Sequence, residues 1–201
     1  EPFVEGGAVR HAGERVGAGL LGDDPLSGAA GTGAVVAGIG NDTLRAVVDD
    51  GDDTYIGGAG IDTYNLSATS VVASINLTLG TASSAETGND TLVEIENVVG
   101  SSGNNVITDA TGANRLDGGA GNDTFVLVSD DARDLLLGAA GVDTVDYTAV
   151  AASLTVNLGS AATVVVTGSG TTALLSDTVN GIENFIGGSG NDNIVGTAAA
   201  N

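Results

Sequence analysis

Residues 118–126 read Gly-Gly-Ala-Gly-Asn-Asp-Thr-Phe-Val, and this nine-residue pattern recurs along most of the chain. Residues 57–65 and residues 187–195 are two further clear copies. The copies share Gly at position 4, with the exception of Leu175, Asp or Asn at position 6, with the exception of Gly33, and a large apolar residue at position 8. A unit this short cannot bury its apolar residue alone, so the pattern predicts that successive copies stack into a solenoid.

Twelve copies can be aligned on the residues at positions 4 and 6. They begin at Gly19, Gly28, Ala37, Val48, Gly57, Ala85, Gly100, Asp109, Gly118, Gly138, Thr172 and Gly187. Position 8 played little part in this alignment, yet it is apolar or aromatic in every copy: Leu26, Val35, Leu44, Tyr55, Tyr64, Leu92, Ile107, Leu116, Phe125, Val145, Val179 and Ile194. This agreement supports the frames.

Each position of the pattern has a structural requirement. Glycines at positions 1, 2 and 4 permit positive φ, and therefore a tight turn with exposed carbonyl groups. Positions 7 to 9 form a short strand in which position 8 points inward and positions 7 and 9 point outward. Two copies then close a coil of 18 residues, so every second copy lies on the same side. The Asp at position 6 lines the turns, where a hard cation can join one coil to the next.

The repeated pattern resembles the RTX family of nonapeptide-repeat proteins, which Gram-negative bacteria export by type I secretion. The resemblance covers residues 19–195, with interruptions. It implies an all-β fold, a right-handed parallel β-roll or β-solenoid with inserted strands, that binds several Ca²⁺ ions between its turns. The residues that it implies as metal ligands are Asp24, Asp42, Asp53, Asp62, Asp90, Asn105, Asp123, Asp143, Asp177 and Asp192.

The spacing of the copies predicts which ligands face each other. Asp24 and Asp42 lie two uninterrupted copies apart, and Asn105 and Asp123 do so with one neutral ligand, so we expect the second site to bind calcium more weakly. The pairs Asp42 with Asp62 and Gly33 with Asp53 require the coil to absorb two extra residues, 46–47. The copies that contain Asp90, Asp143, Asp177 and Asp192 flank longer insertions, and the sequence leaves their partners open.

The interruptions suggest four segments. Residues 1–18 form an N-terminal cap or connector, and residues 19–65 form a first repeat block. Residues 66–137 and 138–201 each combine inserted strands with repeats, and the second ends in a truncated repeat. The insertions at residues 71–79 and 152–159 should add strands to the same sheets. They belong to a longer internal repeat, in which Asp90-Thr91 matches Asp177-Thr178 and Ile95-Glu96-Asn97 matches Ile182-Glu183-Asn184.

The amino-acid composition excludes several classes of partner. The chain has 26 acidic and 5 basic residues, a net charge of −21. This excess argues against nucleic acid and anionic membrane surfaces as partners and favours divalent cations. Mean hydropathy is nevertheless +0.25, unlike an acidic disordered chain. There is no Cys, and no apolar run is long enough to insert into a membrane.

No catalytic pattern stands out, and we expect no enzyme activity. His11 is the only histidine, so zinc sites built on two histidines are excluded. The glycine pattern at residues 17–22 lacks the strand and helix of a dinucleotide site. Carboxylates such as Asp50, at position 3 of its copy, are expected to be extra turn residues that matter less than Asp42.

The sequence therefore suggests a calcium-dependent structural module of a secreted or cell-surface protein of a Gram-negative bacterium. It would be a subunit of a surface layer, an adhesin or an extracellular filament. The alternative is an RTX accessory domain of a type I-secreted hydrolase, a protease or lipase. Residues 196–201 resemble half a repeat, which leads us to expect end-to-end association of the chain with itself when calcium is present.

Overall fold

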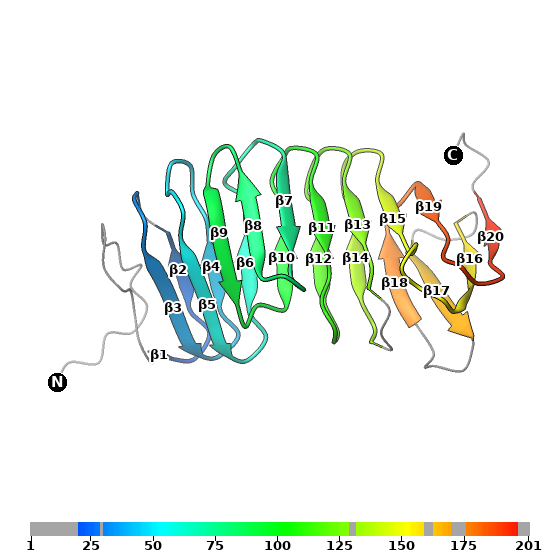
Figure 1. Ribbon diagram of the computed structural model, residues 1–201, viewed down its shortest axis with the longest axis horizontal. Helices are drawn as coiled ribbons and strands as arrows, with labels where there is room; N and C mark the ends of the chain where they lie inside the picture. The colour runs from blue at the N-terminus through cyan, green and yellow to red at the C-terminus, as the bar shows by residue number, and fades with distance from the viewer. Residues whose placement is uncertain (1–19, 29, 129–131, 159–162, 170–175, 197–201) are drawn as a thin grey trace.

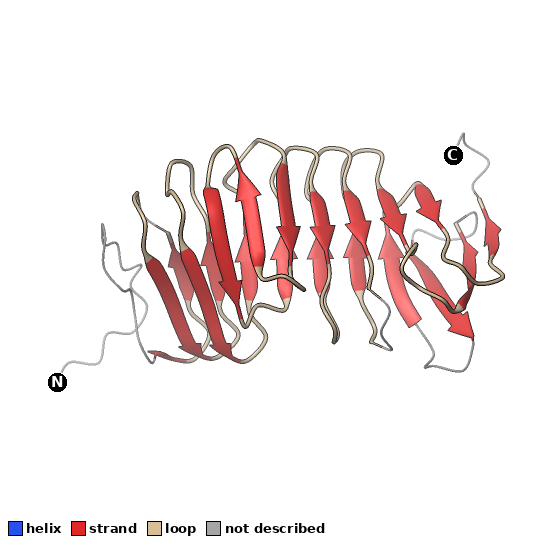
Figure 2. Ribbon diagram, in the orientation of Figure 1, coloured by secondary structure: helices blue, strands red, loops and turns tan. Residues whose placement is uncertain are grey.

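The computed structural model describes residues 20–28, 30–128, 132–158, 163–169 and 176–196. The described residues form two ten-stranded sheets, and the strands of both sheets stack along the long axis of the molecule (Figure 1). The chain alternates between the two sheets, as the coil predicted from the repeats requires. Figure 2 shows strands and loops only, so the described part of the chain contains no helix that could cross a membrane. The proposed cap at residues 1–18 lies outside the described residues.

The first sheet consists, in spatial order, of β1 (Leu20–Leu21), β3 (Ala34–Ile39), β5 (Thr54–Ala59), β9 (Gly88–Val93), β8 (Thr81–Ser84), β7 (Ala73–Asn76), β11 (Val106–Thr108), β13 (Thr124–Val126), β15 (Thr144–Asp146) and β19 (Asn184–Ile186). The second consists of β2 (Pro25–Ser27), β4 (Thr43–Arg45), β6 (Thr63–Asn65), β10 (Asn97–Val99), β12 (Arg115–Asp117), β14 (Leu135–Leu137), β18 (Ser176–Asn180), β17 (Thr163–Ser169), β16 (Ser153–Asn157) and β20 (Asn193–Val195).

Strand register confirms the predicted coil. Leu26 pairs with Leu44 and Ile107 with Phe125, each in parallel strands and 18 residues apart. Leu44 then pairs with Tyr64, 20 residues further on. The two extra residues at 46–47 are thus absorbed in a longer turn, and the apolar side chains stay in phase.

The core lies between the two sheets, and the position-8 side chains of the copies contribute to it along the whole stack. Eleven of the twelve position-8 side chains are buried, and Ile194 is the exception at 40% exposed. Burial of each large side chain contributes about 1.5–3 kcal/mol. Tyr55 and Tyr64 meet edge to face across the core, with ring centroids 5.1 Å apart. Inward orientation of position 8 is therefore confirmed for all copies but the last.

The two insertions add strands as predicted, one set to each sheet. Residues 71–79 contribute β7, which forms an antiparallel meander with β8 and β9. Residues 152–159 contribute β16, which forms another with β17 and β18. Each meander interrupts the parallel order of one sheet, while the facing sheet continues without an added strand at that point.

Three strands arise from segments that were not counted as copies of the pattern. They are β10, β14 and β19, which place Val98, Leu136 and Phe185 against the core. Each has an acidic residue two positions earlier, namely Glu96, Asp134 and Glu183. These segments were not recognised as copies of the nine-residue pattern for two reasons. Glu94 and Ala132 replace Gly at position 4 of two segments, and two of the segments overlap a recognised copy.

Candidate metal centre

The position-6 side chains form a ladder of hydrogen bonds along each side of the molecule. One oxygen of each carboxylate accepts the backbone N–H of the residue at the same point of the preceding coil. Asp24 donates to Asp42 Oδ1 at 2.8 Å, and Asp42 donates to Asp62 Oδ1 at 2.8 Å. The same contact joins Gly33 to Asp53, Asp53 to Asp90, Asn105 to Asp123, Asp123 to Asp143, Asp134 to Asp177, and Leu154 to Asp192.

The structure thus brings together every pair for which the sequence predicted a partner. It also supplies neighbours for the residues whose partners the sequence left open. Asp90 follows Asp53 because the inserted strands β7 and β8 return the chain to the same side. Asp143 follows Asp123 after one coil of 20 residues that passes through β14. The carboxylates are also more enclosed than ordinary turn residues. Asp42, Asp62 and Asp143 are at most 1% exposed.

The second oxygen of many of these carboxylates lacks a donor. Among the described residues, the buried Oδ2 atoms without a hydrogen-bond partner include those of Asp24, Asp42, Asp53, Asp62, Asp123 and Asp143. A buried charged oxygen without a partner is costly, and proteins compensate it with a proton or with a cation. The row of such oxygens at one phase of the repeat therefore favours cation binding.

The environment of the carboxylates also raises their pKa values, as expected for oxygens that lack a compensating charge. Burial raises the pKa of Asp53 and of Asp143 to about 6, although a backbone N–H donor on each partly offsets the effect. Burial likewise raises the pKa of Asp42, Asp62 and Asp123. Neighbouring carboxylates add to the rise, as Asp24 does at Asp42. A bound divalent cation would reverse this repulsion.

Backbone oxygens complete the surroundings of the ladders. Gly60 has φ +155°, and a Cβ on it would collide with the carbonyl oxygen of Gly40 in the preceding coil. A Cβ on Gly57 would collide with both Asp62 Oδ2 and the carbonyl oxygen of Glu94. Acceptor oxygens therefore converge beside the repeat glycines, where only a missing side chain leaves them room. Such an all-oxygen arrangement fits Ca²⁺.

Side chains alone do not complete a site. Within the described residues, no three His, Cys, Asp or Glu side chains converge on one point. A calcium ion held between two coils would take carboxylate oxygens from at most two side chains, such as Asp42 and Asp62, and the rest from turn carbonyls. Calcium tolerates such mixed ligands because its coordination geometry is flexible.

Asn105 differs from the aspartates in the predicted ligand set. Its amide nitrogen donates to the carbonyl oxygens of Gly103 and Gly118, at 2.8 and 3.0 Å, and to Asp123 Oδ1 at 3.1 Å. The amide thus donates hydrogen bonds to turn carbonyl oxygens. At the aspartates, such oxygens have no donor of this kind and lie near carboxylate oxygens. We therefore keep the prediction that this pair binds calcium weakly.

Asp50 was interpreted as an expendable turn residue, and the structure contradicts this. Its side chain is fully buried, and its Oδ2 accepts hydrogen bonds from the Val47 N–H at 2.8 Å and the Tyr55 hydroxyl at 2.7 Å. Sequence periodicity could not reveal this role, because Tyr55 was assigned only an apolar function at position 8.

A second ladder, at position 5, was also missed. Asp23 Oδ1 accepts the Asn41 N–H at 2.7 Å, and Asn41 Oδ1 accepts the Ile61 N–H at 2.9 Å. Here each side chain accepts from the following coil, whereas position 6 accepts from the preceding one. The frequent Asn at position 5 of the copies was the sequence feature that could have predicted this second ladder.

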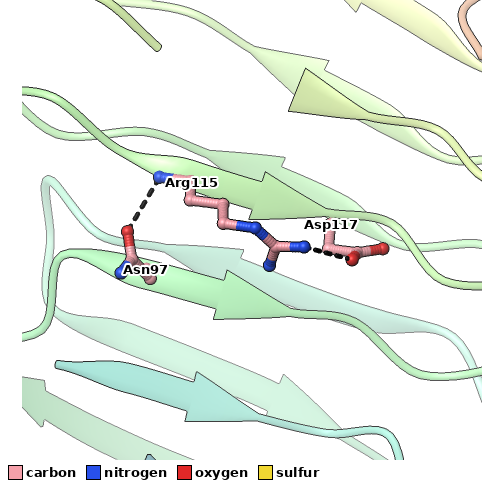
Figure 3. A network of polar contacts seen from close by, with 3 residues as sticks. All are labelled: Asn97, Arg115 and Asp117. Atoms are coloured by element: carbon pink, nitrogen blue, oxygen red, sulfur yellow. Dashed lines mark hydrogen bonds and ion pairs between the residues drawn. The ribbon is translucent and has the colours of Figure 1, made fainter. Parts of the chain in front are cut away.

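The outer face of the second sheet carries a related contact (Figure 3). Asn97 Oδ1 accepts the Arg115 N–H at 2.8 Å, which again ties one coil to the next. Arg115 also forms an ion pair with Asp117 at 3.0 Å. Both side chains are solvent-accessible, so this ion pair contributes at most about 1 kcal/mol.

Comparison with known families agrees with the geometry. The family model described as the RTX calcium-binding nonapeptide repeat matches residues 99–127 and 177–201, in four copies. These residues include β11, β12, β13, β19 and β20, together with Asn105, Asp123, Asp177 and Asp192. The comparison with curated proteins found no match. These two segments of the chain carry RTX calcium-binding nonapeptide repeats, and the stacked strands of the described residues form an all-β β-roll.

Proposed function

We propose that this chain is a calcium-dependent structural module of a secreted or cell-surface protein. The observation that carries the proposal is the row of buried carboxylate oxygens without donors, which includes those of Asp42, Asp62, Asp123 and Asp143. Calcium bound between the coils would neutralise these oxygens and link each turn to the next. Extracellular fluid supplies calcium at the concentrations that weak, mixed-ligand sites require, about 10⁻⁴–10⁻³ M.

The experiment is a calcium titration followed by far-ultraviolet circular dichroism. We expect the chelated protein to be largely unfolded and to become rich in β-structure as calcium is added, because metal binding and folding are coupled when ligands come from separate coils. Equilibrium dialysis in the same buffer counts the bound ions. A spectrum that is unchanged by a chelator, together with no bound calcium, would overturn the proposal.

The finer proposal is that the module assembles end to end, as a surface layer, adhesin or filament subunit. One end of the described structure exposes Ile186, Ile194 and Val195, and the other exposes Leu21. The edge strands β19 and β20 belong to the same two sheets as β1 and β2. A second copy can therefore continue both sheets in parallel, with its first coil on the last coil of its neighbour.

Sedimentation velocity at rising protein concentration, with and without calcium, tests this assembly. We expect larger species in calcium only, and Ile194→Lys should reduce them because it places a charge on the exposed edge. A species that stays monomeric in millimolar calcium would contradict the assembly. It would favour the alternative of an accessory domain attached to a secreted hydrolase.

A further inference from the structure

Each inserted meander ends in two carboxylates that lie six residues apart. They are Asp90 and Glu96 after β7 and β8, and Asp177 and Glu183 after β16 and β17. In both cases the aspartate belongs to the sheet that contains the meander and the glutamate precedes the next strand of the facing sheet. The same arrangement therefore occurs twice, once in each sheet, which allows its chemistry to be compared within one molecule.

The two aspartates have internal donors on both oxygens. Asp90 accepts the Asp53 N–H on Oδ1 at 3.0 Å and the Tyr64 hydroxyl on Oδ2 at 2.5 Å. Asp177 accepts the Asp134 N–H on Oδ1 at 3.0 Å and the Tyr147 hydroxyl on Oδ2 at 2.7 Å. The Oδ2 atoms that lack donors elsewhere along the ladders are here bonded to tyrosines of the core. These two Oδ2 atoms therefore already have a protein donor, whereas the other oxygens lack a partner in the described structure that could compensate their charge.

The two glutamates make the contact that position-6 aspartates make elsewhere. Glu96 Oε2 accepts the Asp62 N–H at 2.7 Å, and Glu183 Oε2 accepts the Asp143 N–H at 2.8 Å. Asp62 and Asp143 are fully buried, and the Oδ2 atom of each has no hydrogen-bond partner in the described structure. Burial and nearby carboxylates raise the pKa of both aspartates, and the glutamates are among those neighbours.

A backbone carbonyl oxygen lies near the buried carboxylate in both arrangements. A Cβ on Gly57 would collide with both the Glu94 carbonyl oxygen and Asp62 Oδ2, and a Cβ on Gly138 would collide with both the Gly181 carbonyl oxygen and Asp143 Oδ2. Glu94 and Gly181 each lie two residues before the glutamate and have positive φ, +54° and +66°. The left-handed turn therefore directs a carbonyl oxygen toward the buried carboxylate. An uncompensated carboxylate oxygen, a carbonyl oxygen and a second carboxylate are ligands for a hard divalent cation.

We propose that Asp62 with Glu96, and Asp143 with Glu183, form two calcium sites at the ends of the inserted meanders, while Asp90 and Asp177 bind tyrosine hydroxyls and no cation. The inference rests on the proposed function, because it assigns residues within a calcium-binding module. It replaces two of the aspartates implied by the repeat pattern with two glutamates outside the recognised copies. At each insertion, a tyrosine hydroxyl compensates the aspartate of the inserted meander. Calcium compensates the carboxylates that precede the next strand of the facing sheet.

The test counts calcium bound to the whole chain by equilibrium dialysis at saturating calcium, with circular dichroism to verify folding. Glu96→Gln and Glu183→Gln keep an oxygen for the N–H donor but lose the charge. We expect each to lower the calcium content by about one ion. The matched control is Asp49→Asn, which loses the same charge from an exposed side chain that belongs to neither site and should keep the wild-type content.

The second arm uses Asp90→Asn, Asp177→Asn and Tyr64→Phe. We expect these variants to keep the wild-type calcium content but to unfold at a lower temperature in calcium, because a buried hydrogen bond is weakened or lost. The two meanders are tested separately, so a variant that fails to fold at one leaves the other informative.

Glutamate variants with wild-type calcium content would overturn the inference, and so would Asp90→Asn or Asp177→Asn with fewer bound ions. A wild-type chain that binds no calcium would instead refute the proposed function itself. The two failures are therefore distinguishable in one set of measurements.

Discussion

At the residue scale, the two oxygens of a position-6 carboxylate have separate tasks. In Asp62, Oδ1 accepts the Asp42 N–H, and this contact fixes the side-chain orientation. Oδ2 is thereby held beside the turn carbonyls without a donor of its own. A ligand oriented in advance by a hydrogen bond binds metal better than a free one. The hydrogen-bond ladder therefore orients the oxygens that would bind the cations.

Asp42→Ala and Asp50→Ala should have different effects: the first should reduce calcium binding, and the second should reduce stability. Asp42→Ala removes a proposed calcium ligand, so we expect fewer bound ions and a higher calcium concentration at the folding midpoint. Asp50→Ala leaves the Val47 N–H and the Tyr55 hydroxyl without their acceptor. We expect it to keep the calcium content but to lose about 1–3 kcal/mol of unfolding free energy. Dialysis and urea unfolding in saturating calcium check both; equal calcium contents would contradict the assignment.

The raised pKa values predict an inverted pH dependence for the calcium-free chain. Asp53 and Asp143 have pKa values of about 6 when folded, against the ordinary value of 3.8. The folded state therefore binds more protons than the unfolded state between about pH 4 and pH 6, so stability rises as pH falls through this window. We expect more β-structure in chelator at pH 5 than at pH 7.

Calcium should reverse this trend, because protons compete with the cation for the same oxygens. The calcium midpoint of folding is expected to rise as pH falls from 7 to 5. Circular dichroism at the two pH values, with chelator and with a calcium titration, measures both effects. A calcium-free chain that loses β-structure on acidification would show that the buried carboxylates do not titrate as the fold requires.

At the scale of the elements, turns from successive coils stack as closely as their backbones allow. Gly60 and Gly112 both have positive φ, +155° and +101°. A Cβ on Gly60 would collide with the Gly40 carbonyl oxygen, whereas a Cβ on Gly112 would have no atom within 4 Å. The first glycine is thus required by conformation and by stacking, and the second by conformation alone.

Gly60→Ala and Gly112→Ala separate these two requirements. Both should lose about 1 kcal/mol or more because Ala is strained at positive φ. Gly60→Ala should lose about 1–3 kcal/mol in addition, since the coils must move apart. Urea unfolding in saturating calcium measures the difference, and equal losses would show that turn stacking does not limit the coil.

Much of this element arrangement follows from periodicity in the sequence. Inward residues such as Phe125, the 18-residue coil and the strands added by the insertions were all predicted. The strand that carries Val98 was not, because Glu94 replaces Gly at position 4 of that segment and adopts positive φ, +54°, despite its side chain. The bond between Tyr64 and Asp90 was also missed, because partners 26 residues apart leave no periodic trace.

At the scale of the whole molecule, the chain carries a net charge of −21, and its described residues fold into two narrow sheets. Self-repulsion opposes this compact state, and salt relieves it over a Debye length of about 8 Å at physiological ionic strength. Screening does not supply ligands to enclosed oxygens such as Asp62 Oδ2 and Asp143 Oδ2. General ionic strength and specific cation binding therefore have separable effects on folding.

The last prediction is that calcium folds the chain and that neither sodium chloride nor magnesium replaces it. Magnesium requires near-octahedral geometry and keeps several waters, for which the enclosed oxygens around Gly57 and Gly138 leave little room. Small-angle X-ray scattering should give a radius of gyration approaching about 50 Å in chelator with sodium chloride, as for an unfolded chain of this length. Millimolar calcium should lower it and produce the elongated particle of Figure 1. If sodium chloride at matched ionic strength produced the same particle, charge screening alone would fold the chain, and the buried oxygens would need no cation.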